Sequence, residues 1–112
     1  MKTLTLSLKK KWFDMIRSGE KVEEYRECKN YWIYRFSKLC GYFEYRFGEN
    51  GIEMILADRL KCDKLVFTLG YPKAGDTSRR LEFKNPKIRI DTGKPEWGAE
   101  PGKKYFVITW EK

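Results

Sequence analysis

Hydrophobic and polar positions alternate at the start of the chain. Leucines at positions 4, 6 and 8 are separated by Thr and Ser residues, and this period of two is typical of a strand with one buried face. The spacing then lengthens to that of an amphipathic helix with Trp12 and Ile16 on its apolar side. We predict this helix from about Ser7 or Leu8 to Arg17, with Ser7 as its N-cap.

A helix-to-strand turn follows at Gly19, because a helix C-terminus favours a residue that tolerates positive φ. Alternation resumes from Lys21 to Glu27 and predicts a second strand. In a regular strand Glu24 and Arg26 share one face while Lys21 points to the other. Lys21 therefore joins them only if it lies in the turn, before strand pairing begins.

The patterns between residues 30 and 61 predict a second helix and two weaker elements. Asn30 can cap a helix over residues 31–39, whose apolar residues are spaced for burial, and Gly41 ends it. Residues 42–47 alternate and predict a short strand. After a predicted turn at residues 48–51, apolar residues at helical spacing predict a third helix over residues 52–60.

The last third of the chain predicts strands joined by turn-rich loops. One hairpin loop is expected at residues 70–76, and a longer loop surrounds Trp97. Pro86 interrupts one strand, and its missing N–H implies a sheet edge or a bulge there. The predicted strands span residues 64–69, 79–83, 87–90 and 105–110.

Together these elements indicate an α+β fold. Five or six strands with two or three helices, and strand neighbours far apart in sequence, predict a small mixed β-barrel. A chain of 112 residues is one domain with a single core. No apolar run approaches the roughly 18 residues of a membrane span, and the start does not resemble a secretory signal. We expect a cytoplasmic location.

The charge balance favours an anionic partner. Lys and Arg total 24 against 16 acidic residues, which gives a net charge of +8 and a pI near 9.4. A positive field raises the local concentration of polyanions, so nucleic acid is the leading partner class. A net charge of this size also promotes solubility, which is the alternative reason for it.

Cysteine and histidine usage limits the chemistry open to the chain. Cys28, Cys40 and Cys62 are far apart and odd in number, which indicates reduced thiols and neither a disulfide framework nor a zinc knuckle. The chain has no histidine, so His-based nucleophile pairs and zinc motifs are excluded. We predict no cofactor and no metal centre.

Two stretches resemble the ASCH family of small PUA-like barrels. Gly19, Lys21 and Arg26 fit its GxKxxxxR pattern, within an opening that resembles short bacterial and phage members through Trp32. The run over residues 94–102 and the Tyr-Phe-Val-Ile strand after it resemble the same members. The resemblance implies RNA or a nucleotide-like ligand bound in a cleft beside the motif. It also makes residues 41–61 an insertion relative to the shortest members.

Binding of RNA or a modified nucleoside is the leading function, because phosphates attract cations and unstacked bases stack on aromatic rings. Trp97 is the most interesting ring, because it lies in a Gly/Pro loop, although burial as a lid over the barrel end is the equal alternative. The candidate ligand-binding residues are Lys9, Lys10, Lys21, Tyr25, Arg26, Tyr71, Arg79, Arg80 and Trp97.

Hydrolysis is the alternative function, and whether the chain is an enzyme is left open. One branch of the ASCH family resembles amidohydrolases that act on N4-acetylcytidine with a Lys, a Thr and a Glu. Lys21 matches the Lys and Glu82 matches the Glu, but Glu24 stands at the Thr position. A water-based route would use Glu82 or Glu24 as general base and Lys21 to stabilise the oxyanion. Catalytic candidates are therefore Lys21, Glu24 and Glu82.

Two alternatives to nucleic-acid binding and hydrolysis also fit the residues. In the first, the two acids beside one lysine form a structural ion-pair network. In the second, the chain is a protein-interaction module that uses residues 41–61 as its contact surface. The sequence does not determine the oligomeric state or the pathway.

Overall fold

The computed structural model describes residues 2–40, 43–48, 51–56 and 62–112. Within them the chain is an α+β domain with a five-stranded mixed sheet, a separate two-stranded hairpin and two α-helices. The strands are β1 (Thr3–Leu8), β2 (Glu24–Glu27), β3 (Phe43–Gly48), β4 (Gly51–Leu56), β5 (Lys64–Leu69), β6 (Arg80–Thr92) and β7 (Lys104–Glu111), and the helices are α1 (Lys10–Ser18) and α2 (Asn30–Cys40).

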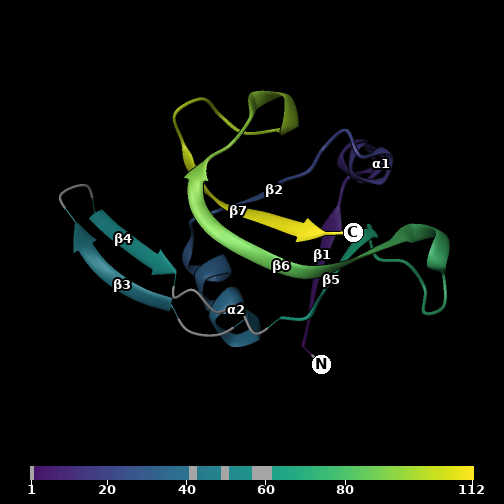
Figure 1. The fold of residues 1–112 in the computed structure, drawn as a ribbon, viewed down its shortest axis with the longest axis horizontal. Coiled ribbons are helices and arrows are strands. Elements are labelled where there is room, and N and C mark those ends of the chain that lie inside the picture. The colour runs from purple at the N-terminus through teal and green to yellow at the C-terminus, as the bar shows by residue number, and fades with distance from the viewer. Residues whose placement is uncertain (1, 41–42, 49–50, 57–61) are drawn as a thin grey trace.

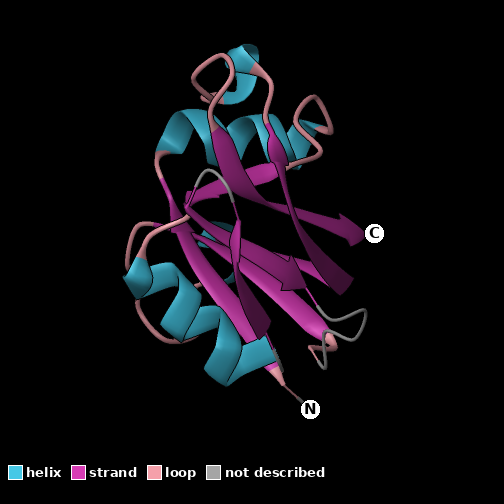
Figure 2. Cartoon of the chain, turned by 90° about the vertical axis from the view of Figure 1, so that its left-hand side faces the viewer, coloured by secondary structure: helices cyan, strands magenta, loops and turns pink. Residues whose placement is uncertain are grey.

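The main sheet has the strand order β1-β5-β6-β7-β2. β1 and β5 are parallel, and the other three pairs are antiparallel. The sheet curls, and β6 bends along its length (Figure 1). The β3–β4 hairpin lies to one side of this sheet, at the left of Figure 1, and Figure 2 shows the helices outside the strands.

β1 and β2 are the two outer strands, so the described sheet is not closed as a barrel by backbone pairing. The two edges are nevertheless close enough for one side chain to span the gap between them. The Arg26 guanidinium on β2 donates through Nη2 to the Ser7 carbonyl oxygen on β1 over 2.9 Å. The α+β prediction is confirmed, and the barrel stays a prediction.

The main core lies between the curled sheet and the helices. Phe13 and Ile16 of α1 and Ile33 and Phe36 of α2 are buried against the apolar face of the sheet, as their helical spacing predicts. A second buried cluster lies beside it and combines β2 and β7 with the loop after β6. This second cluster consists of Tyr25, Trp97, Ala99, Tyr105 and Val107, with Met15 packed against it.

The first helix starts later than predicted. The alternating burial of β1 continues to Leu8, so Ser7 belongs to the strand and does not cap the helix. Lys9 is the N-cap residue and makes no side-chain capping hydrogen bond. Gly19 ends the helix with φ 86°, as predicted.

The predicted third helix is wrong. Gly51–Leu56 is the strand β4, antiparallel to β3, with Gly48 opposite Gly51. The apolar residues at positions 52, 54 and 56 also fit a period of two, and Asn-Gly between two apolar runs is a strong hairpin signal. Residues 57–61, which the helix prediction included, lie outside the described part.

The interruption predicted at Pro86 is confirmed as a bulge. β6 continues through it, and its register against β7 shifts between Lys84 and Lys87. Asn85 has φ 49°, a left-handed conformation that Asn tolerates better than most residues. Among the described residues, no helix is both long enough and apolar enough to span a bilayer.

Candidate functional site

Lys21 lies in the turn between α1 and β2. Its backbone N–H donates to the Met15 carbonyl oxygen over 3.0 Å, and the Gly19 N–H donates to the Ile16 carbonyl oxygen over 3.1 Å. β2 begins only at Glu24, so the side chain of Lys21 is not bound by strand alternation. The condition for bringing Lys21 to the face of Glu24 and Arg26 is therefore met.

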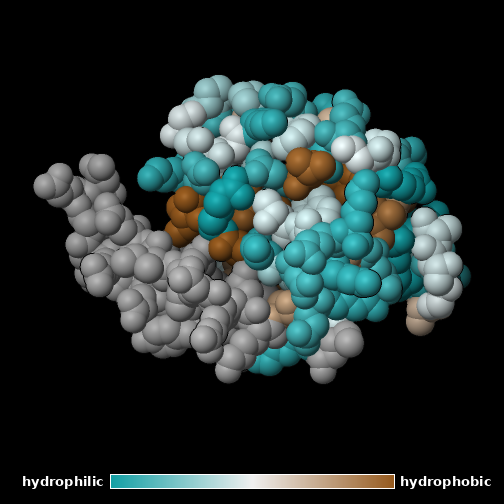
Figure 3. All heavy atoms as spheres, viewed as in Figure 1, coloured by the Kyte–Doolittle hydropathy of each residue, from teal (hydrophilic) through white to brown (hydrophobic). Residues whose placement is uncertain are grey.

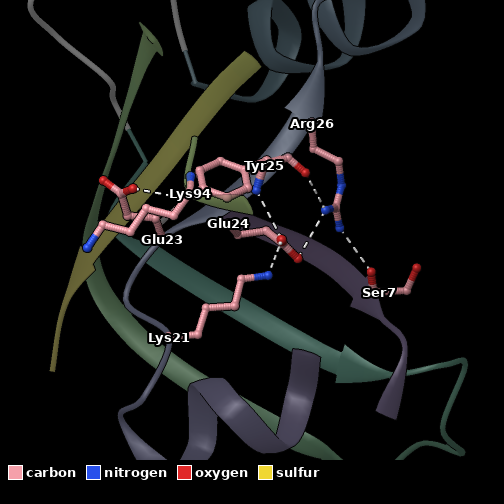
Figure 4. A network of polar contacts seen from close by, with 7 residues as sticks. All are labelled: Ser7, Lys21, Glu23, Glu24, Tyr25, Arg26 and Lys94. Atoms are coloured by element: carbon pink, nitrogen blue, oxygen red, sulfur yellow. Dashed lines mark hydrogen bonds and ion pairs between the residues drawn. The ribbon is translucent and has the colours of Figure 1, made fainter. Parts of the chain in front are cut away.

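Lys21, Glu24 and Arg26 form one network (Figure 4). Lys21 Nζ lies 2.9 Å from Glu24 Oε1, and Arg26 Nη1 lies 3.1 Å from Glu24 Oε2. The backbone N–H of Tyr25 also donates to Glu24 Oε1 over 3.0 Å. Lys21 is 1% exposed and Glu24 is 4% exposed, so the ion pairs are inside the protein.

Two cations share one carboxylate in this network, which leaves a surplus of one positive charge. Burial lowers the pKa of Lys21; Glu24 opposes this effect, and the nearby Arg26 adds to it. The ammonium also lies 4.4 Å from the ring centroid of Trp12, whose π-face attracts a cation. The network holds its charges by internal contacts.

The hydrogen-bond donors of Arg26 are used inside the protein. Its guanidinium donates to the carbonyl oxygens of Tyr25 and Ser7, each over 2.9 Å. The contact to Glu24 Oε2 is close enough for an ion pair but lacks the geometry of a hydrogen bond, so that buried oxygen accepts none from the described groups. Arg26 therefore connects the two sheet edges. The network differs from the predicted structural one, in which two acids flank one lysine, because here two cations share the single acid Glu24.

Glu82 is not part of this network. Leu81 and Phe83 pack against the main core, so Glu82 between them points to the opposite face of the sheet. Glu24 is opposite Ile108, a core residue, and lies on the core face. Glu82 instead pairs with Lys64 over 2.9 Å on the surface. The three catalytic candidates do not come together.

Tyr25 and Trp97, two of the proposed stacking rings, are each 8% exposed and belong to the second buried cluster. The Tyr25 hydroxyl donates to Glu23 and accepts from the backbone N–H of Lys94. Burial raises the pKa of Tyr25 to about 12. Trp97 thus fits the predicted burial in the loop, and neither ring is open for a base to stack on.

The loop that carries Trp97 approaches β2 and α1 closely. A Cβ added at Gly93 would lie 2.7 Å from both Ala99 Cβ and Tyr25 Cζ, and one added at Gly98 would lie 3.0 Å from Trp12. Glycine at both positions therefore allows the loop to dock on its neighbours.

The other five binding candidates gather at one end of the sheet. The parallel pairing places Leu8 opposite Leu69, and Gly70 N–H donates to the Leu8 carbonyl over 3.3 Å. The start of α1 and the β5–β6 loop are consequently neighbours, at the right of Figure 1. These five candidates are Lys9, Lys10, Tyr71, Arg79 and Arg80.

This end of the molecule is positively charged. Residues 9–14 and 70–80 contain six basic and two acidic residues, and Asp14 and Asp76 pair with Lys10 and Arg79. Arg80 donates to loop carbonyls and fixes the loop, whereas Tyr71 is 96% exposed. We name the exposed set the α1–β5 surface: Lys9, Lys10, Lys11, Tyr71, Lys73 and Arg79.

Four cationic and aromatic side chains near the surface are absent from the predicted binding residues. Lys11 and Lys73 belong to the α1–β5 surface, and their neighbours in sequence were already candidates. Tyr31 and Arg35 on α2 are not among the predicted binding residues, because the pattern over residues 31–39 indicates only a helix with apolar residues spaced for burial. Tyr31 is 63% exposed, and its place outside the helix's apolar stripe was the available signal.

Other parts of the chain offer less chemistry. Within the described segments, no three Cys, Asp or Glu side chains are grouped so that they could hold a metal ion. Cys28 is an exposed cysteine and Cys62 is buried in the main core. The side chain of Cys40 and those of the proposed contact surface at residues 41–61 lie outside the described part. On the face drawn in Figure 3, the described hydrophobic residues appear only in small areas among hydrophilic ones.

No protein-family model, curated protein or solved structure matches this chain.

Proposed function

We propose that this protein binds single-stranded nucleic acid, in the first place RNA, through the α1–β5 surface. The observation that carries the proposal is the fully exposed Tyr71 among cations that outnumber their carboxylates. Phosphates supply affinity through such cations, and each base stacked on an aromatic ring adds about 1–3 kcal/mol.

Family membership is part of the same proposal. The GxKxxxxR residues, the opening of the chain and the run around Trp97 carry the resemblance to ASCH domains. Arg26 supports a barrel-like arrangement, because its side chain spans the gap between the outer strands β1 and β2. The proposed ligand surface differs from the cleft that the family motif implies, because Lys21 and Glu24 are buried.

The binding test uses fluorescently labelled dodecauridylate, an unstructured single strand, and measures anisotropy between 50 and 200 mM salt. Binding should weaken as salt rises, because phosphate contacts release counterions. Lys9→Gln with Lys73→Gln should lower the magnitude of the log–log salt slope by about 1.4, since each single-strand contact contributes about 0.7. Tyr71→Ala should weaken binding without changing the slope.

The matched control replaces two exposed lysines of β6, Lys84 and Lys87, with Gln. Lys84 is opposite Lys64 at the start of β5, at the other end of this strand from the α1–β5 surface. The control removes the same charge and should leave the slope near that of the wild type. Equal losses in both double variants would assign the binding to net charge alone and contradict the proposed surface. Absence of salt-dependent binding in the wild type would contradict the function itself.

Hydrolysis of an acylated base is the second candidate, and the contact between Lys21 and Glu24 favours it. An ammonium whose pKa is lowered by burial donates its proton more readily to a developing oxyanion. The position of Glu82 on the other sheet face weighs against it. Incubation with N4-acetylcytidine, with Lys21→Met as the inactive control, tests it: cytidine release by the wild type alone would replace binding as the primary function.

A further inference from the structure

A second group of aromatic and cationic side chains lies on α2, in which Tyr31 is exposed and Trp32 and Arg35 are half-buried. Tyr31 and Arg35 are one helical turn apart and therefore neighbours on one face. Two guanidiniums lie close to the ring of Trp32, with Arg26 Cζ 5.1 Å and Arg35 Cζ 5.3 Å from its centroid. Tyr31 contacts the Trp32 ring edge-on, with a centroid distance of 4.9 Å. We call Tyr31, Trp32 and Arg35 the α2 surface.

The α2 surface is held rigidly from beneath. Trp32 stacks on Phe36 at 5.5 Å, and Phe36 contacts the core residue Phe106 at 5.1 Å. This aromatic ladder runs from the exposed Tyr31 into the main core. A ring fixed in this way costs little conformational entropy when a ligand stacks on it.

Arg35 keeps donors for a ligand. Its Nη2 donates to the Thr5 carbonyl oxygen over 2.6 Å, which fixes the guanidinium at the edge of β1. No carboxylate of the described residues forms an ion pair with it. A guanidinium has five N–H donors in a fork that suits phosphate oxygens. Within the described part of the chain, the Thr5 carbonyl is the only acceptor that takes a hydrogen bond from Arg35.

The α2 surface and the α1–β5 surface lie along the same strand. Arg35 is bonded to Thr5, and Lys9 follows four residues later at the end of β1. At about 3.3 Å per residue these points are roughly 13 Å apart along the strand. Arg26, bonded to Ser7, adds positive charge between them. A single strand of several nucleotides is long enough to contact both surfaces.

We propose that the α2 surface is a second contact for single-stranded nucleic acid, with a base stacked on Tyr31 and a phosphate bound by Arg35. The proposal rests on the nucleic-acid function proposed above and extends the binding path along β1. The structural alternative is that Arg35 only caps the edge of β1 and that Tyr31 is an ordinary exposed residue of a helix. Capping accounts for the Thr5 contact but gives no role to the exposed ring.

Photocrosslinking of the wild-type protein tests the proposal without any variant. Dodecauridylate substituted with 4-thiouridine is irradiated in complex, and the crosslinked tryptic peptides are identified by mass spectrometry. Cleavage after Lys29 and Arg35 yields a peptide of residues 30–35, and cleavage after Lys64 and Lys73 yields one of residues 65–73. Crosslinks to both peptides are expected. Crosslinks to residues 65–73 without residues 30–35 would overturn the α2 contact and leave the proposed function intact.

Affinity measurements give the second test. Tyr31→Ala should weaken binding of dodecauridylate at least about fivefold, the ratio that corresponds to about 1 kcal/mol of stacking, while Tyr31→Phe keeps the ring and should stay within about twofold. An unchanged affinity for Tyr31→Ala, alongside weakened binding in Tyr71→Ala, would overturn this proposal alone. A wild type that does not bind the strand would instead contradict the proposed function.

Discussion

At the scale of single residues, the charge imbalance of the buried network is its most informative property. Lys21 and Arg26 both depend on Glu24, and Glu24 has no second acidic neighbour in the network. Buried ions are tolerated only when they are paired. The two halves of the Lys21–Glu24 ion pair should therefore differ in how much the fold depends on them.

Glu24→Gln should destabilise the protein far more than Lys21→Met does. The first change leaves the buried Lys21 and the half-buried Arg26 without a carboxylate and should cost about 3–5 kcal/mol. The second leaves Glu24 paired with Arg26 and should cost less than about 2 kcal/mol. Urea unfolding at pH 7 measures both. Equal losses would show that the contact itself, and not the charge surplus, determines the energetics.

At the scale of elements, the hydroxyl of Tyr25 helps to attach the loop after β6 to β2. The Tyr25 hydroxyl donates to Glu23, the residue just before β2, and accepts from the backbone N–H of Lys94 in the loop. Gly93 lies against the same ring. Glu23 is in turn paired with Arg89 of β6 over 2.7 Å. Loop, turn and strand are consequently fixed to one another at this point.

Tyr25→Phe should remove stability in a pH-dependent way. Near neutral pH the loss of its hydrogen bonds should cost about 1–2 kcal/mol. Tyr25 ionises near its ordinary pKa of 10.0 when unfolded and at about 12 when folded, so the native state holds the proton longer. Its contribution is complete below pH 10 and is lost as pH rises to 12, by up to about 2 kcal/mol.

The measurement is the difference in unfolding free energy between wild type and Tyr25→Phe from pH 8 to 12. That difference should shrink above pH 10. The lowered pKa of Lys21 makes stability rise with pH below its ordinary 10.5, but Lys21 is present in both proteins and cancels. A constant difference across this range would show that Tyr25 ionises alike in both states.

The spacing of apolar residues predicted correctly whether a segment is a helix or a strand wherever that spacing fitted only one of the two. β1, β5 and β7 alternate or run continuously apolar between turn signals, and α1 keeps one apolar side. Gly51–Leu56 fitted both periods, and pairing with β3 decided for a strand. A helix and a strand of six residues differ little in local free energy, so a neighbouring strand can determine the outcome.

At the scale of the whole molecule, the Arg26 side chain links the outer strands β1 and β2, which are not paired through their backbones. Arg26 reaches from β2 to β1, and Arg35 caps the same edge from α2. Both guanidiniums satisfy carbonyls that an unpaired edge strand would otherwise expose to other chains.

Arg26→Lys should cost about 1–3 kcal/mol although it keeps the charge. One ammonium cannot bond the Tyr25 and Ser7 carbonyls together in the fixed geometry of a guanidinium. Hydrogen exchange of the β2 amides should accelerate in the variant. Arg17→Lys, at an exposed ion pair, serves as control and should stay within about 0.5 kcal/mol. Wild-type stability of Arg26→Lys would contradict the bridging role.

The sequence by itself determined the α+β class, most strand and helix positions, an interruption of strand pairing at Pro86 and the excess of positive charge. These are local properties, set by apolar spacing, turn residues and composition. Only the tertiary structure decided which charges meet. Pairing of β2 and β6 with β7 fixed opposite faces for Glu24 and Glu82, and the parallel pairing of β1 with β5 gathered the cations around Tyr71. Alternation assigns faces within one strand, but the face of one strand relative to another depends on register across the sheet.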